Sequence, residues 1–285
     1  MKSRKASGAW SYSADVPPDA DSTAWCLMAL KSYAELRVNE LDKSRKCLWN
    51  HFKDQGIATY TSDSGIQEFI SAPNKELITG WTSAHPDVSV AAVLADINNE
   101  KTPAVMKWLI EKQHEGLIDS YWWRVPYYTT TLVLRVLSIL EKELPKNLAE
   151  QLVKKTIEDQ LPNGSFGLES SNEPDAFTTA MALELMVNLS SSGTDQAINK
   201  CLRALLESQQ PNGAWNGGFI LRIPAPFVTN PETVGSWNKE TGGGNSYVKD
   251  QNGIFATTMA CYALDLWRRT KSYQYKSTTV KSSIL

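Results

Sequence analysis

The sequence predicts an all-α fold, an α/α toroid of helical-hairpin repeats, on three observations. A glycine followed closely by an aromatic residue recurs along the 285-residue chain, at Gly8, Gly56, Gly116, Gly164 and Gly213. After each of these markers come a turn-rich loop and an apolar stretch rich in Ala and Thr. Amphipathic stretches with one charged face lie between the apolar ones. Units that cannot bury their apolar face alone must stack, and we expect a ring of inner helices surrounded by outer helices.

The elements follow in chain order. The expected inner helices are residues 21–36, 85–97, 125–140, 174–189 and 253–267, whose small side chains suit packing on all sides. The expected outer helices are residues 39–55, 102–115, 144–160 and 194–210, whose apolar residues recur at helical spacing. This is fewer helices than a closed toroid of this kind usually has. The ring is therefore either open or completed by another subunit or a second copy.

The domain organisation follows from the repeats. Residues 1–270 are expected to form one α/α barrel domain, and the polar, repeat-free residues 271–285 a flexible C-terminal tail. The long segment from residue 217 to 252 is interpreted as a lid or as a plain connector.

Composition excludes several classes. A formal net charge of -2 with scattered charges gives no electrostatic footprint for nucleic acid. Four widely spaced cysteines and an N-terminus without an apolar signal segment indicate a reduced, cytoplasmic protein. No apolar run reaches the roughly 18 residues of a membrane span, so we expect any membrane contact to be peripheral.

Ten tryptophans and ten tyrosines are the unusual feature of the composition. Trp10, Phe166 and Trp215 recur with the repeat, which favours a role in holding the repeats together. The aromatic residues that break the pattern are more informative about function. They are Trp122, Trp123, Tyr127 and Tyr128.

The stretch PPDADSTAW places Asp19 and Asp21 where a turn ends and an apolar helix begins. Asp is a favoured N-cap, and similar helix starts at Asp87 and Asp175 favour that structural interpretation. The pair of aspartates, however, is found only in the first repeat. This favours a functional site.

These motifs resemble the terpene cyclases of the squalene–hopene cyclase and class II diterpene cyclase kind. Residues 160–166 and 210–215 resemble their QW repeats, and residues 19–24 match five of the six positions of their acid motif, D-x-D-D-T-A. The resemblance implies proton-initiated cyclisation or isomerisation of an isoprenoid or polyene. It also implies Asp21 as the proton donor and Asp19 as a supporting carboxylate. Aromatic faces would stabilise the cation.

The chain departs from this family at three points. Ser22 stands where the motif has its last Asp, and Ala91 stands where the hopene cyclases have a His that bonds to the acid. His85 either substitutes for that His or is structural. The chain also has only one barrel domain where many members have two.

The resemblance implies a substrate site lined by Trp122, Trp123, Tyr127, Tyr128 and Trp215. Arg124 and Arg222 would hold a polar head group, the alternative being rim arginines in salt bridges. No motif implies a metal or an organic cofactor, although Mg²⁺ could accompany a diphosphate substrate.

Rival functions are a zinc-dependent prenyltransferase, for which only Cys47 and His51 are suitably spaced, and a glycosidase with paired carboxylates. The main rival is a catalytically silent toroid that binds an apolar ligand or a partner protein.

Overall fold

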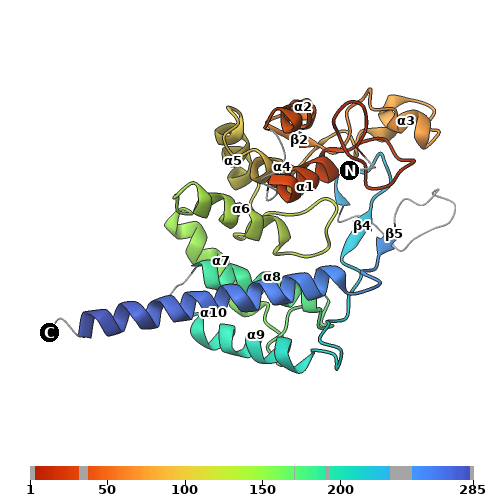
Figure 1. Ribbon diagram of the computed structural model, residues 1–285. Helices are drawn as coiled ribbons and strands as arrows, with labels where there is room; N and C mark the ends of the chain where they lie inside the picture. The colour runs from red at the N-terminus through yellow and green to blue at the C-terminus, as the bar shows by residue number, and fades with distance from the viewer. Residues whose placement is uncertain (1–3, 32–37, 170, 190–192, 232–245, 283–285) are drawn as a thin grey trace.

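Helices form an inner and an outer layer in the computed structural model of the chain (Figure 1). The structure describes residues 4–31, 38–169, 171–189, 193–231 and 246–282. In the inner layer are α1 (Ala20–Lys31), α4 (Pro86–Ala95), α6 (Tyr128–Ile139), α8 (Ala176–Leu189) and α10 (Ile254–Ser282). In the outer layer are α2 (Val38–Trp49), α5 (Thr102–Glu111), α7 (Lys146–Glu158) and α9 (Asp195–Glu207). The predicted all-α toroid of helical hairpins is confirmed.

The three middle inner helices, α4, α6 and α8, are buried on nearly all sides, which explains their apolar sequences, whereas α1 and α10 at the two ends of the series are buried mainly on one side. In α8 every side chain from Phe177 to Val187 is buried, because α6, α10 and two outer helices pack around it. In α9, by contrast, the buried residues recur at helical spacing on one face. Burial on one face or on all faces therefore separates the outer helix α9 from the inner helix α8.

One hydrogen bond recurs in all five units and explains the glycine–aromatic markers. A backbone N–H just after each marker glycine donates to a Thr or Ser hydroxyl near the start of the inner helix. The pairs are Trp10 with Thr23 (3.0 Å), Ile57 with Ser89 (2.7 Å), Ile118 with Thr130 (2.8 Å), Phe166 with Thr179 (3.0 Å) and Trp215 with Thr257 (3.0 Å). Four of the glycines have φ between 85° and 94°, the region that favours glycine. The glycine–aromatic markers thus join each loop to the start of its inner helix.

Short strands and helices fill the loops at one end of the ring. Strands β1 (Phe52–Lys53), β2 (Gly56–Ala58) and β3 (Ala84–His85) form an antiparallel sheet in that order. The helix α3 (Ile66–Phe69) and a 3₁₀ turn (Lys75–Ile78) lie between β2 and β3.

The predicted lid contains a β-hairpin. β4 (Leu221–Ile223) pairs antiparallel with β5 (Ser246–Val248), and Leu221 also bridges to Trp123 in the loop before α6. Residues 232–245 of the predicted lid lie outside the described residues. The described part of the segment from residue 217 to 252 is therefore bridged to the loop before α6 that carries Trp122 and Trp123, which we call the aromatic loop.

The ring is open between α1 and α10. Each inner helix packs on the next, from α1 through α4, α6 and α8 to α10. Within the described ranges, no comparable packing joins α1 to α10.

Residues 271–282, expected to belong to a flexible tail, continue α10 as a helix. They contain neither Gly nor Pro, so no residue there ends the helix. This part of α10 extends beyond the rest of the molecule (Figure 1). In the described part of the chain, no helix is both long and apolar enough to span a membrane.

Candidate active site

Asp19 is the N-cap of α1. Its Oδ1 accepts a hydrogen bond from the Ser22 N–H at 2.6 Å, just as Asp175 accepts one from the Thr178 N–H at 2.7 Å before α8. Its Oδ2, however, is buried with no hydrogen-bond partner in the described chain. Burial raises the pKa of Asp19 from 3.8 to about 6, although hydrogen bonds from Ser22 offset part of the rise. The first aspartate therefore caps the helix and also presents an unpartnered oxygen.

Asp21 lies in the first turn of α1 and does not cap it, since no described backbone N–H donates to its carboxyl group. Burial is the main cause that places the pKa of Asp21 well above 3.8. The nearby carboxyl groups of Asp19 and Asp87 raise this pKa further, and the Trp25 side chain, one turn along α1, offsets part of the rise. The protonated form of Asp21 is therefore favoured, which is the form that a proton donor needs.

Asp87, in the first turn of α4, ties that helix to the aromatic loop. Its Oδ2 accepts a hydrogen bond from the Trp122 N–H at 2.8 Å, and its Oδ1 accepts one from the Val88 N–H at 3.1 Å. Burial raises the pKa of Asp87, and these bonds partly offset the rise. The carboxyl group of Asp87 thus fixes the backbone of Trp122 at the start of α4.

The side chain of Trp122 is held by a chain of hydrogen bonds that ends at His85. The indole N–H donates to Thr59 Oγ1 at 2.7 Å, and Thr59 Oγ1 lies 2.8 Å from His85 Nδ1. His85 Nε2 lies 2.8 Å from the Gly80 carbonyl oxygen, which can only accept, so Nε2 carries the proton and Nδ1 accepts from Thr59. Burial lowers the pKa of His85 to about 3, which keeps the ring neutral.

Both nitrogens of His85 are therefore engaged, and its ring stacks on Tyr121 at 3.8 Å between centroids. Of the two interpretations of His85, the geometry fits the structural one. His85 supports Trp122, and it does not hydrogen-bond to the acid.

Trp123 and Tyr128 form an aromatic stack on the inner side of the ring. Their rings are parallel with centroids 4.0 Å apart, Phe177 of α8 stacks on Trp123 at 5.5 Å, and Phe255 of α10 meets Trp123 edge-on at 5.7 Å. The Tyr128 hydroxyl is buried and has no hydrogen-bond partner in the described chain. Burial raises the pKa of Tyr128, and the next contributions come from Asp21 and Asp87, so the hydroxyl lies close to these carboxyl groups.

These side chains form what we call the acid–aromatic group. Its members are Asp19, Asp21, Asp87, Trp122, Trp123 and Tyr128. The sequence prediction did not single out Trp25, Phe177 and Phe255, although a signal for each existed. Trp25 follows Asp21 by one helical turn, and Phe177 and Phe255 lie at the starts of inner helices.

Tyr127 and Trp215 do not join this group. The Tyr127 hydroxyl donates to Asp159 at 2.9 Å, and its ring packs edge-on against Phe166. The Trp215 indole N–H donates to the Leu205 carbonyl oxygen of α9 at 2.8 Å. Both rings therefore pack against the outer parts of the repeats, which accounts for their burial.

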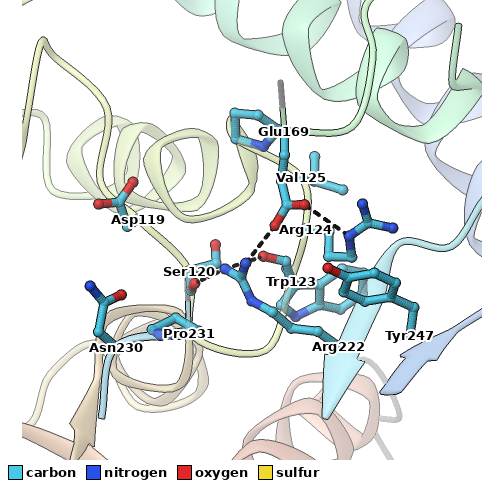
Figure 2. A pocket seen from close by; sticks show the side chains of 11 residues that line it. Asp119, Ser120, Trp123, Arg124, Val125, Glu169, Arg222, Asn230, Pro231 and Tyr247 are labelled. Carbon is cyan, nitrogen blue, oxygen red and sulfur yellow. Dashed lines mark hydrogen bonds and ion pairs between the residues drawn. The ribbon is translucent and has the colours of Figure 1, made fainter. Parts of the chain in front are cut away.

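A pocket of about 400 Å³ lies beside Trp123, on the loop side of the acid–aromatic group (Figure 2). Figure 2 shows Glu169 between the two predicted head-group arginines. Glu169 accepts from Arg124 Nε at 3.0 Å and from Arg222 Nη1 at 2.5 Å. Arg222 also donates to the carbonyl oxygens of Ser120, Tyr121 and Trp123. The salt-bridge alternative for these arginines thus fits the geometry, since Glu169 and the backbone already engage them.

The zinc alternative has little geometric support. His51 Nδ1 lies 3.1 Å from the Ala58 carbonyl oxygen. Among the residues that the structure describes, no group of three or more His, Cys, Asp or Glu side chains could hold a metal ion.

No protein-family model and no curated protein matches the chain, whereas solved structures do. The type II terpene cyclase MstE from Scytonema, in its apo form, matches with a TM-score of 0.82 and 26% identity, over 94% of this chain and 80% of that one. An MstE variant in complex with its substrate, geranylgeranyl dihydroxybenzoate, matches with a TM-score of 0.81 and 26% identity, over 94% and 79% of the chains. A variant in complex with the product merosterolic acid A matches with a TM-score of 0.82 and 26% identity, over 94% of this chain and 78% of that one.

The chain thus has a class II terpene cyclase-like fold, as the QW-like and acid motifs indicated. A protein from Actinoplanes, 23% identical, shares the fold with a TM-score of 0.81.

Proposed function

We propose that this chain, which has the fold of the type II terpene cyclases, cyclises or isomerises a hydrophobic isoprenoid or polyene, with Asp21 as the general acid. The observation that carries the proposal is the acid–aromatic group. Its central carboxyl group has a raised pKa because it is buried beside two other carboxyl groups, and aromatic rings lie next to it. The MstE complexes with a prenylated substrate support the substrate class.

In the proposed reaction the Asp21 proton adds to an alkene carbon, and the π electrons of the alkene form the new C–H bond. The neighbouring carbon becomes a cation, which an internal alkene attacks to form a C–C bond. The last cation loses a proton to water and the Asp21 carboxylate takes up a proton from water, so the acid is restored and the product is an isomer of the substrate. The faces of Trp122, Trp123 and Tyr128 stabilise the cation by about 0.5 to 2 kcal/mol for each well-placed ring.

The supporting residues keep the acid in place. Asp19 holds the start of α1 and raises the pKa of Asp21, while Ser22, the departure from the acid motif, hydrogen-bonds to Asp19. Asp87 and His85 fix Trp122 from two sides, at its backbone and, through Thr59, at its indole. The bond from Ser22 to Asp19 comes from the backbone N–H of Ser22, which any residue other than proline at that position would supply, so the Ser22 departure leaves the cap of α1 intact.

The proposed chemistry needs no metal or organic cofactor, because a side chain supplies the proton, and Mg²⁺ enters only with a diphosphate substrate. We also propose a cytoplasmic location with a hydrophobic small molecule as the partner.

The test is incubation of the purified protein with geranylgeranyl dihydroxybenzoate, farnesyl and geranylgeranyl diphosphates, squalene and oxidosqualene, followed by mass spectrometry. We expect an isomeric product from at least one substrate. Asp21→Asn removes the proton but keeps the shape of the side chain, so turnover should fall by about 10²- to 10⁴-fold.

The control variant is Asp175→Asn, which changes the equivalent cap of α8 and lies outside the acid–aromatic group. It should retain turnover. If the folded wild-type protein converts none of these substrates, the proposal fails and the silent binding toroid becomes the better description.

A further inference from the structure

Arg135 of α6 lies on the inner side of the ring. Its Nη2 contacts Met259 Sδ at 3.9 Å, and its guanidinium group lies 4.6 Å from the centre of the Tyr262 ring, both on α10. Since α8 separates α6 from α10, and α7 and α9 pack against α8 from the outer layer, these side chains can meet only on the inner face.

The guanidinium group is fixed on one edge and open on the other. Nε and Nη2 donate to the two carboxylate oxygens of Glu184 at 2.5 and 2.6 Å, and Glu184 is fully buried. No hydrogen bond in the described chain uses Arg135 Nη1, and the side chain keeps 22% exposure. A bidentate pair holds the guanidinium plane still, so the Nη1 edge is a preoriented donor.

The position of Arg135 relative to the acid is set by the helix. Arg135 follows Tyr128 by seven residues, so it lies about two turns, or roughly 10 Å, further along the same face of α6. The charge of Asp21 contributes to the raised pKa of Tyr128, so the two groups lie within electrostatic reach of each other. The inner face of the ring thus carries a proton donor at one level and a half-engaged cation at another.

Packing alone does not account for this ion pair. Replacing a buried ion pair by apolar side chains of similar size is often neutral or stabilising, and the residues around this pair are mostly apolar. The two arginines predicted to hold a head group, Arg124 and Arg222, are instead engaged by Glu169 and by backbone oxygens.

We propose that Arg135 is the head-group anchor, with Nη1 donating to a carboxylate at the polar end of a prenylated substrate whose terminal alkene reaches Asp21. The inference rests on the proposed function for its substrate. Glu184 is a positioning residue, since it acts only by orienting Arg135.

The test measures binding in the Asp21→Asn background, so that turnover does not interfere. The probes are geranylgeranyl dihydroxybenzoate, which carries a free carboxylate, and its methyl ester. We expect the free acid to bind at least about tenfold more tightly than the ester, and Arg135→Gln to remove this preference while the affinity for the ester changes little.

Two further variants keep the test independent of folding. Arg135→Leu combined with Glu184→Leu leaves no unpaired buried charge, and it should also lose the preference while its circular dichroism and melting temperature stay close to those of the parent. Arg45→Gln, which breaks an ion pair on the outer helix α2, should retain the preference.

The inference is overturned if the double variant keeps the preference, if neither probe binds, or if Arg124→Gln abolishes the preference. If the preference depends on Arg135 but the protein with Asp21 intact converts no substrate, the anchor stands and the cyclase is rejected. Turnover of both probes with no preference would reject the anchor alone.

Discussion

Asp19 and Asp21, two residues apart, have different tasks because they face different groups. Asp19 turns one oxygen back to the Ser22 N–H, whereas Asp21 faces Asp87 and the aromatic rings. Asp19 therefore caps the helix, whereas Asp21 does not cap it and is the residue that we propose as the acid. A sequence cannot separate them, because both positions lie within one turn of the same helix start.

The pH dependence of stability should report the burial of Asp19. Its folded pKa of about 6 lies above 3.8, so between these values the folded protein binds more protons than the unfolded chain does. Its contribution to stability is therefore complete below pH 3.8 and falls by about 3 kcal/mol as the pH rises through 6. Asp19→Asn keeps the cap acceptor and cannot ionise. Urea unfolding between pH 4 and 7 should show the wild-type protein losing about this much free energy of unfolding relative to the variant. If the free energy of unfolding of the two proteins changes with pH in the same way, the raised pKa of Asp19 is contradicted.

His85 should remain neutral over the physiological range. Its pKa of about 3 in the folded protein lies below the usual 6.5, so protonation favours the unfolded chain, and the stability that His85 contributes is lost as the pH falls from 6.5 towards 3. NMR spectra should show no titration of the His85 ring between pH 5 and 8. A midpoint near 6.5 would mean that the ring is not held between Thr59 and Gly80.

At the scale of the element, the hydroxyl near the start of each inner helix holds the preceding loop. Thr257 and Thr258 offer a matched pair, since Thr257 accepts from the Trp215 N–H while Thr258 is exposed. Thr257→Val leaves a partly buried N–H without its acceptor and should cost about 1 to 3 kcal/mol. Thr258→Val should change stability by less than about 0.5 kcal/mol. Equal midpoints of denaturant unfolding for the two variants would show that this hydrogen bond does not matter.

The elements were the most predictable part of the molecule, because the contrast between apolar and amphipathic stretches reports burial directly. For example, residues 144–160 were expected as an outer helix, and α7 spans Lys146–Glu158. The facing of single aromatic residues was less predictable. Tyr127 and Tyr128 are neighbours, but successive helical positions point about 100° apart, so one packs on the outer layer and the other on the acid. The residue types alone do not show which of the two tyrosines faces the inner side of the ring.

At the scale of the whole molecule, the seam between α1 and α10 is the feature that the repeat count predicted, whereas the length of α10 was not predicted. The packing of α10 on α8 comes from its first half, where Ala256, Ala260 and Ala263 are buried. Beyond it, Lys271 pairs with Asp195 of α9, and the helix then leaves the body of the protein (Figure 1). The ring therefore depends on the start of α10.

A truncation should separate the two halves of α10. Deleting residues 273–285 removes the end of the part of α10 that extends beyond the rest of the molecule (Figure 1), so the free energy of unfolding should change by less than about 0.5 kcal/mol. Ala260→Leu, in contrast, adds three carbons where α10 meets α8 and should cost about 1 to 3 kcal/mol through overpacking. Guanidinium unfolding of both variants measures this difference. If the truncation destabilises the protein as much as Ala260→Leu does, the far half of α10 must make contacts that hold the open ring together, either within the chain or with a second copy across the seam. Unfolding midpoints that rise with protein concentration would then identify the second copy.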